Sequence, residues 1–310
     1  MTEKNADSTK GRALLTVDVE DWFNILDTPS APPITEWSQL ECRFDRGLNK
    51  ILEIAEAHGA KATFFWLGWF AERHPDLVRL CDSLGHETAS HGYGHVLPYK
   101  IGRQAFRDDL LHAKAVLEDI IGVPIKGFRS PGFGVLRGTG WCFDEIITAG
   151  FEYDSSIFPM ARAHGGVEDA LLSPHLIETS VGRLVEIPQS AFTAWGTRFS
   201  VFGGGYLRLA PLRLIKYGVD QCKKGGRPVV LYVHPRELDP SHPRLDLPPW
   251  RRFKSYVNLD TVETKPQLAT SILFLHKNGR VCKKRRGQRR RHAGGLLQLK
   301  ALSTATKTTS

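Results

Sequence analysis

Two histidines separated by three residues, His91 and His95, have the types and spacing to do chemistry. Neutral imidazole nitrogens are common ligands for Zn²⁺ and similar cations, and this spacing would place both rings on one side of a helical turn. Gly92 and Gly94 disfavour a helix, because glycine costs about 1 kcal/mol in a helix interior. We therefore expect a tight loop before a helix. Two ordinary polar residues would show the same spacing.

A group of carboxylates follows the apolar run 13–17, at Asp18, Glu20 and Asp21. In a parallel α/β sheet, the carboxyl ends of the strands form the ligand crevice. Three carboxylates at such a strand end indicate a metal ligand beside a general base, although a solvated acidic turn would contain the same residues. Strand alternation places Glu20 on the same face as Asp18.

Basic side chains also follow expected strands. Arg129 comes directly after the strand expected at 125–128, and His234 comes directly after the apolar run 229–233. A lone histidine after a strand is usually structural. Here it is one of several polar groups placed at strand ends, which favours a shared site.

The elements that would position these groups alternate between apolar runs and segments with helical periodicity. This pattern predicts an α/β fold with a barrel-like sheet. Three glycines at 203–205 predict a turn where the backbone approaches another group closely. The expected strands lie at 13–17, 62–67, 86–90, 125–128, 151–156, 185–188 and 229–233, and the expected helices at 42–58, 74–84, 103–121, 141–149 and 209–222.

The composition is that of a globular protein, with 41% hydrophobic and 24% charged residues among 310. The sequence contains no apolar run of about 18 residues, so no membrane span is predicted. The polar first residues lack the apolar stretch of a secretory signal. We therefore expect a cytoplasmic protein. Five cysteines without a Cys-x-x-Cys pair indicate reduced thiols.

The net charge of +9 comes from one end of the chain. Residues 277–310 contain eleven basic and no acidic residues, which leaves 31 basic and 33 acidic residues upstream. No nucleic acid is therefore expected to bind the body of the chain. The tail, 266–310, is expected to be disordered, either as a polyanion-binding arm or as an accidental extension.

The motifs in this order resemble the NodB-type polysaccharide deacetylases, carbohydrate esterase family 4. The resemblance covers about residues 13–240. The Asp-Val-Glu-Asp-Trp and His-Pro-x-Glu forms are similar to a subgroup linked to exopolysaccharide gene clusters and related to an allantoinase-like branch. Gly92 and Gly132 depart from the family pattern. The matching segments are 16–21, 91–95, 129–133 and 232–234.

The resemblance implies an α/β fold, a distorted (β/α) barrel of the NodB-homology type with about seven strands. It makes residues 13–265 a polysaccharide deacetylase domain between a disordered 1–12 and the basic tail. It implies a hydrolase of non-peptide carbon–nitrogen bonds that removes N-acetyl groups from N-acetylhexosamine units of an oligo- or polysaccharide. Its cofactor would be a divalent metal ion, zinc first, with cobalt, manganese or nickel as alternatives.

The same resemblance assigns the residues. Asp21, His91 and His95 would bind the metal, Asp21 being preferred to Glu20 because the family ligand is an aspartate. Asp18 would act as general base.

Arg129 would orient Asp18, and a protonated His234 would act as general acid. Substrate would contact four residues, Trp22, Tyr93, Pro131 and Phe133.

Two other functions compete. The first is an amidohydrolase acting on a small cyclic amide or ureide, but the allantoinase-like branch lacks the paired histidines. The second is a non-catalytic carbohydrate-binding or basic-tailed interaction protein, against which the set Asp18, Arg129 and His234 counts. The sequence does not address the oligomeric state.

Overall fold

The computed structural model of the protein describes residues 13–162 and 165–261. The disorder expected for residues 1–12 and 266–310 falls outside the described residues.

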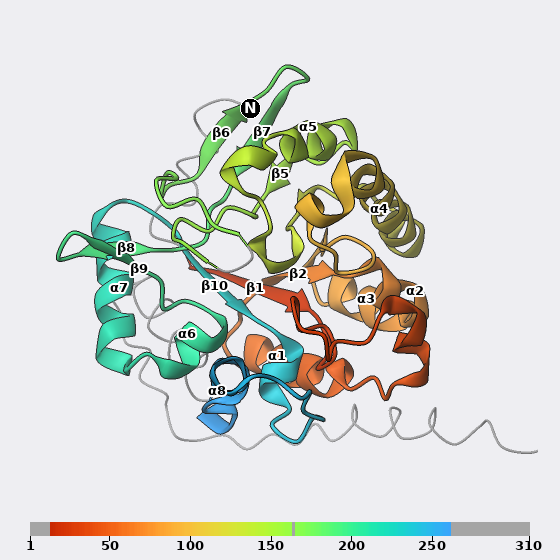
Figure 1. The fold of residues 1–310 in the computed structure, drawn as a ribbon, viewed down its shortest axis with the longest axis horizontal. Helices are drawn as coiled ribbons and strands as arrows, with labels where there is room; N and C mark the ends of the chain where they lie inside the picture. The colour runs from red at the N-terminus through yellow and green to blue at the C-terminus, as the bar shows by residue number, and fades with distance from the viewer. Residues whose placement is uncertain (1–12, 163–164, 262–310) are drawn as a thin grey trace, which may run out of the picture. The chain divides into compact units, whose positions relative to one another are not determined.

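One sheet of eight strands carries the candidate site (Figure 1). Its order is β10-β1-β2-β3-β4-β5-β7-β6, and every pair is parallel except β6 with β7. The sheet is open, with β10 and β6 at its edges, so the predicted barrel-like sheet of about seven parallel strands is confirmed as an incomplete barrel. The strands are β1 (Ala13–Val19), β2 (Ala62–Trp66), β3 (Glu87–Ser90), β4 (Gly127–Phe128), β5 (Tyr153–Asp154), β6 (His175–Glu178), β7 (Arg183–Glu186) and β10 (Val229–Val233).

Helices follow most of the parallel strands, as predicted. The expected helix at 209–222 begins later because Pro211 precedes it, and Gly102 interrupts α4 with a φ of 79°. A hairpin of β8 (Phe192–Ala194) and β9 (Thr197–Phe199) was not predicted. The helices are α1 (Phe44–Ala57), α2 (Gly68–Arg73), α3 (Pro75–Ser83), α4 (Pro98–Ile121), α5 (Trp141–Thr148), α6 (Gly204–Leu209), α7 (Leu212–Lys224) and α8 (Pro249–Tyr256).

Strands β1, β2 and β10 are largely apolar because both faces of the sheet are covered. All five residues of β10 are buried, and Val17 of β1 and Phe64 of β2 are both 0% exposed. Parallel strands covered on both faces are continuous apolar runs rather than alternating ones. This is why the sequence revealed them.

The strand register aligns the carboxyl ends at one edge of the sheet. Val17 of β1 pairs with Val233 of β10, and Ser90 of β3 pairs with Phe128 of β4. The residues that follow these strands therefore emerge side by side, which positions the candidate site.

Gly203 lies where the backbone approaches another group closely, as the glycine cluster predicted. It forms a parallel bridge with Tyr232 of β10. A Cβ atom at this position would lie 2.1 Å from the Tyr232 ring. The next two glycines open α6 rather than extend a turn.

Two further expectations concern the described residues. No helix in residues 13–162 and 165–261 has both the length and the apolar character to cross a bilayer. Cys42, Cys81, Cys142 and Cys222 are free thiols, as expected; the fifth cysteine lies outside the described residues.

Candidate metal and catalytic site

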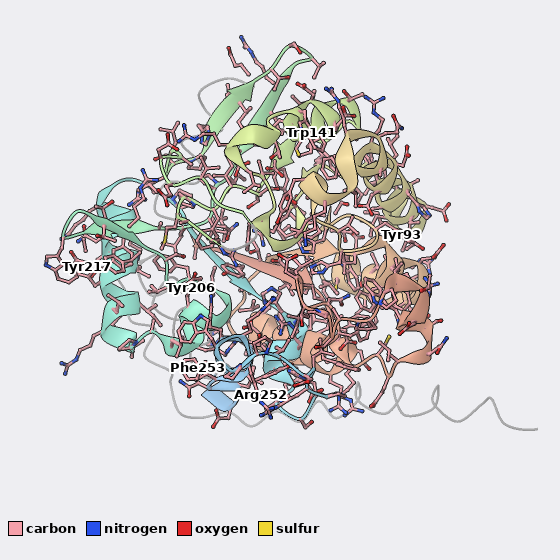
Figure 2. All side chains as sticks on the ribbon, viewed as in Figure 1. Tyr93, Trp141, Tyr206, Tyr217, Arg252 and Phe253 are labelled. Carbon is pink, nitrogen blue, oxygen red and sulfur yellow. The ribbon has the colours of Figure 1, made fainter. Side chains whose placement is uncertain are left out.

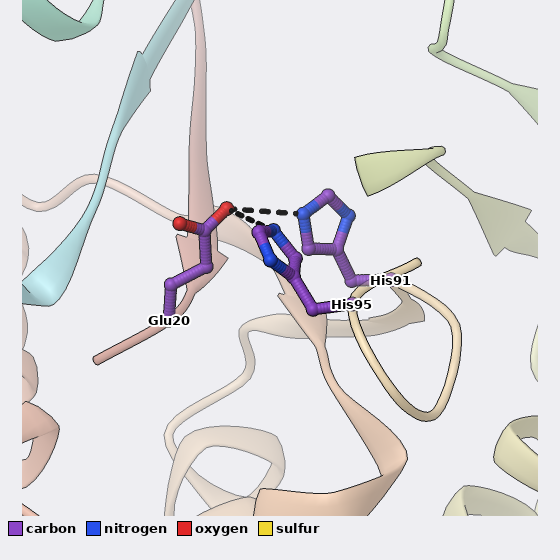
Figure 3. A group of neighbouring side chains, drawn as sticks. All are labelled: Glu20, His91 and His95. Carbon is purple, nitrogen blue, oxygen red and sulfur yellow. Dashed lines mark hydrogen bonds and ion pairs between the residues drawn. The ribbon is translucent and has the colours of Figure 1, made fainter. Parts of the chain in front are cut away.

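Two histidines and one carboxylate, His91, His95 and Glu20, meet at the carboxyl ends of β1 and β3 (Figure 3). The Oε1 atom of Glu20 lies 2.9 Å from Nε2 of His95 and 3.3 Å from Nε2 of His91. The three side chains are at most 7% exposed. The histidines singled out by their spacing therefore share one carboxylate oxygen.

The orientation of His91 is fixed by the neighbouring strand. Its Nδ1 atom lies 2.7 Å from the carbonyl oxygen of Arg129, and its backbone N–H donates to the carbonyl oxygen of Trp66 at 2.8 Å. Because a carbonyl oxygen only accepts, Nδ1 carries the proton. The lone pair of Nε2 then points toward Glu20, as in histidines that bind metals.

A carboxylate on α4 shapes the loop between the two histidines. Asp109 accepts hydrogen bonds from the backbone N–H groups of Tyr93 and Gly94 at 2.9 and 3.0 Å. Gly92 has a φ of 77°, and a Cβ atom there would lie 2.6 Å from Oδ2 of Asp109. Asp109 was not predicted from the sequence, although a carboxylate beside the buried face of the expected helix could have indicated it.

Glu20, and not Asp21, faces the histidines, so the expectation for Asp21 is corrected. Oδ2 of Asp21 accepts from the backbone N–H groups of Arg43 and Phe44 at 2.6 and 3.0 Å. Its Oδ1 accepts from the N–H of Trp22 at 2.7 Å. Phe44 is the first residue of α1. Asp21 therefore accepts hydrogen bonds from N–H groups that have no intrahelical acceptor at the start of the helix.

The surroundings of Glu20 determine its charge. Burial raises the pKa of Glu20, but the electrostatic effects of His95 and His234 and the contacts with the imidazoles of His91 and His95 hold it well below its usual range. Glu20 is therefore ionised at neutral pH. An ionised oxygen ligand beside two imidazoles favours a divalent cation.

Asp18 and Arg129 form a buried ion pair beside this cluster. Nη1 of Arg129 donates to Oδ1 of Asp18 at 2.6 Å and to Oγ1 of Thr16 at 2.9 Å. The two charged side chains are 3% and 0% exposed. The contact expected between them is present, and it leaves Oδ2 of Asp18 directed toward His234 at 3.9 Å.

Behind Arg129 lies a second acidic group, formed by Asp154 and Glu186. Nη2 of Arg129 donates to Oγ of Ser155 at 3.0 Å. Asp154 and Glu186 are paired across β5 and β7 and are both 0% exposed. Burial, and then the charge of Asp154, raises the pKa of Glu186 well above its usual value.

His234 faces the cluster from the end of β10. Its Nε2 atom lies 3.8 Å from Oε1 of Glu20, and its Nδ1 lies 3.1 Å from Oε2 of Glu237. Burial lowers the pKa of His234 to about 4, against the opposing effect of Glu20. The imidazole is therefore neutral at neutral pH in the resting site, whereas the sequence analysis expected it protonated.

Trp22 and Tyr93, which were expected to contact substrate, are held by contacts within the protein. Trp22 is 9% exposed, and its indole N–H donates to the carbonyl oxygen of Glu41 at 3.0 Å. The hydroxyl of Tyr93 donates to Glu72 of α2 at 2.9 Å, and its ring stacks on His112 of α4. Figure 2 labels Tyr93 on the side of the molecule where α2 and α4 lie. Core packing and helix contacts hold both rings.

Pro131 and Phe133, also expected to contact substrate, are both buried. Phe133 is 4% exposed and packs against Phe158 and Tyr232, with ring centroids 5.4 and 5.1 Å away. It therefore supports the strand end that carries His234 rather than presenting a face to solvent.

The donor set fits a divalent metal ion. Glu20, His91 and His95 offer three ligand atoms within 4.8 Å of one another, and Asp18, Glu20 and His234 meet the same condition. Two imidazoles and a carboxylate are typical of a catalytic zinc site, and related ions accept the same donors. In such sites the second ring nitrogen of each histidine usually donates a hydrogen bond that orients the ring, and Nδ1 of His91 does so to the carbonyl oxygen of Arg129.

Two family profiles match parts of the chain. Residues 40–139 match the polysaccharide deacetylase family, and residues 155–275 match a domain of unknown function, DUF3473. The first segment contains His91, His95 and Arg129, and the second contains His234. The site thus draws on both segments and on β1, which precedes them.

Among known proteins, a peptidoglycan-N-acetylglucosamine deacetylase of Bacillus cereus is 33% identical over 82 residues, 26% of this chain and 30% of that relative. The chain spans about a third of the length of the curated relatives it matches.

Solved structures share the fold. A Mycobacterium smegmatis protein classed as a polysaccharide deacetylase superposes with a TM-score of 0.57 at 20% identity, over 84% of this chain and 85% of that one. The allantoinase PuuE superposes with a TM-score of 0.53 at 18% identity, over 85% of this chain and 86% of that one.

Proposed function

We propose that this chain, which carries a polysaccharide deacetylase domain, is a metal-dependent hydrolase that removes N-acetyl groups from N-acetylhexosamine units of a polysaccharide. The observation that supports this most is the meeting of Glu20, His91 and His95 within 4.8 Å. The ion pair of Asp18 with Arg129 lies beside this cluster. This arrangement suits hydrolysis of an amide.

The metal would be held by Glu20, His91 and His95, with zinc as the first candidate. When bound, the ion would supply Lewis-acid chemistry to the acetyl carbonyl and to water. The chain's own residues would supply orientation and proton transfer.

Asp18 acts as general base and takes a proton from the attacking water. Arg129 keeps Asp18 in place through the 2.6 Å contact to Oδ1, which leaves Oδ2 for the proton. A base fixed in this way loses little entropy when the reaction begins.

His234 delivers a proton to the departing nitrogen. Because its imidazole is neutral in the resting site, it gains that proton during the reaction. Oδ2 of Asp18, 3.9 Å from Nε2 of His234, is the nearest source. The C–N bond breaks, and the products are acetate and a free amino sugar.

The substrate class rests on the relatives. The Bacillus cereus relative is named for peptidoglycan N-acetylglucosamine, and we propose an N-acetylated oligo- or polysaccharide for this chain. A role in exopolysaccharide synthesis and a cytoplasmic location are part of the same proposal.

The test is acetate release from N-acetylglucosamine oligomers by the full chain, with and without a chelator, after reconstitution with zinc, cobalt, manganese or nickel. We expect release that a chelator abolishes and metal restores. Release of acetate unaffected by chelation would contradict the metal assignment. Turnover of allantoin but no oligomer would favour the small-ureide alternative, and no turnover with oligomer binding would favour a binding protein.

A further inference from the structure

A chain of buried polar side chains, Arg208, Glu237 and His234, connects the site to α8. All three lie in the segment that matches the domain of unknown function. Resting on the proposed function, we propose that Glu237 and Arg208 are positioning residues that fix the ring orientation and the tautomer of His234. Residues 155–275 would thereby contribute to the reaction by orienting His234, the proposed proton donor.

Glu237 holds the ring of His234. Its Oε2 atom accepts from the backbone N–H of His234 at 2.9 Å and lies 3.1 Å from Nδ1 of the same residue. An ionised carboxylate only accepts, so Nδ1 carries the proton. Nε2 is then the free nitrogen, and it faces Asp18 and Glu20 at 3.9 and 3.8 Å.

Arg208 holds Glu237. Its Nη1 forms an ion pair with Oε1 of Glu237, and both side chains are 2% exposed. A carboxylate buried this deeply is costly without a partner cation. Arg208 therefore keeps Glu237 ionised, the state in which Glu237 only accepts and so determines the tautomer.

Arg208 is in turn held by the end of α8. Its guanidinium donates to the carbonyl oxygens of Lys254, Ser255 and Val257 at 2.8, 3.0 and 2.9 Å. Carbonyls at a helix carboxyl end lack intrahelical donors and favour a cation. The position of His234 is thus set by a helix about twenty residues further along the chain.

The turn that carries Glu237 is also fixed from the opposite side. Gly47 of α1 packs against Pro235, and a Cβ atom at Gly47 would lie 1.8 Å from the carbonyl oxygen of Pro235. The 3-10 turn Pro235–Leu238 therefore has little room to move. A carboxylate on such a turn can select one ring orientation.

A purely structural role for the pair is the competing explanation, and the chain offers a matched control. Glu145 is 0% exposed and pairs with Arg103 and Arg107 of α4, remote in sequence from the 208–237 pair. Glu145→Gln removes the charge of a buried carboxylate with arginine partners, as Glu237→Gln does. It leaves His234 and its contacts intact.

The first measurement is the tautomer of His234 by long-range ¹H–¹⁵N NMR on the zinc-loaded full chain, with His234→Gln used to assign the signal. We expect the Nδ1–H form in the unsubstituted chain and in Glu145→Gln, and loss of that preference in Glu237→Gln. An Nε2–H form in the unsubstituted chain overturns the proposal whether or not the Glu237→Gln protein folds, and this result needs no active substrate. An unchanged tautomer in Glu237→Gln overturns it as well.

The second measurement is deacetylation kinetics. We expect Glu237→Gln to lower kcat by at least about tenfold, as loss of an orienting carboxylate does elsewhere, with KM and zinc content little changed. Glu237→Asp should recover part of the rate. An equal loss in Glu145→Gln would show that the role is structural and would overturn the proposal. If the unsubstituted chain deacetylates nothing, the proposed function fails, while the tautomer result still decides the role of Glu237.

Discussion

The two sides of the candidate site are built differently. On one side, Glu20, His91 and His95 are electron-pair donors directed at one another, held by backbone contacts from neighbouring strand ends. On the other side, the charge of Glu237 beside His234 is already balanced by Arg208. A cation would therefore be required by the first side and not by the second. Substitutions on the first side should remove the metal, whereas substitutions on the second side should lower the rate and leave the metal bound.

The largest effect is expected on the metal side. Glu20→Gln, His91→Ala and His95→Ala should each abolish stoichiometric metal binding and with it nearly all turnover, because each removes one of three ligands. Elemental analysis of metal-reconstituted protein measures this.

Asp21→Asn is the matched control for Glu20→Gln. It should keep the metal but lower stability by about 1–2 kcal/mol, since Asp21 accepts from N–H groups at the start of α1. Thermal unfolding monitors this loss. Loss of metal in Asp21→Asn, with retention in Glu20→Gln, would reverse the assignment of the carboxylate.

Asp18 lies between the two sides, and its substitution should lower the rate without loss of the metal. Asp18→Asn should lower kcat by about 10²–10⁴-fold, the usual contribution of a positioned general base, with metal content unchanged. Parallel kinetics and elemental analysis check this. Near-normal turnover would require the roles of the carboxylates at 18 and 20 to be reassigned.

Gly47→Ala tests how tightly the second side is packed. Helix propensity alone predicts a gain of about 1 kcal/mol, but the added Cβ would meet the carbonyl oxygen of Pro235. We expect a net loss of about 1–3 kcal/mol, typical of overpacking, and a lower kcat with the metal retained. Denaturant unfolding measures the loss. Glu53→Ala, on the exposed face of the same helix, should change stability by less than about 0.5 kcal/mol.

The smallest effect concerns a buried carboxyl outside both sides. The pKa of Glu186 is raised in the folded protein by burial and by Asp154, so the folded state keeps a proton that the unfolded chain releases above about pH 4.5. Stability is therefore lost as pH rises from the unfolded pKa toward the folded one. Glu186→Gln cannot release this proton.

The stability of Glu186→Gln should consequently fall less steeply with pH than that of the unsubstituted chain. Thermal unfolding from pH 4 to pH 9 measures the two slopes, and the difference should amount to a few degrees at the alkaline end. Parallel curves for the two proteins would show that Glu186 has no shifted proton in the folded state.

Much of the fold could be predicted from the sequence because covered parallel strands are apolar runs. The runs ending before Asp18, His91, Arg129 and His234 were recognised, and their polar successors were expected at one edge. The strand periodicity also placed Glu20 with Asp18, which the structure bears out. The family pattern favoured Asp21 instead, whose carboxylate faces the start of α1 rather than the histidines.

Tertiary structure decided what local pattern could not. Asp21 turns away from the histidines because α1 begins 23 residues later and presents N–H groups to it. Trp22 and Phe133 were expected to contact substrate, and only the packed chain shows that their rings are buried. Whether a side chain beyond a strand end faces the site depends on partners distant in sequence, which periodicity does not encode.

The same reason explains why Arg208 was missed. As an arginine in an unpredicted short helix, it carries no local signal. Its partners are Glu237, 29 residues away, and carbonyls 46 to 49 residues away. The sequence determined which residue types gather at the strand ends, because local burial and alternation produce that pattern. The fold alone decided which charges meet, because a buried charge is stable only where distant segments supply its partner.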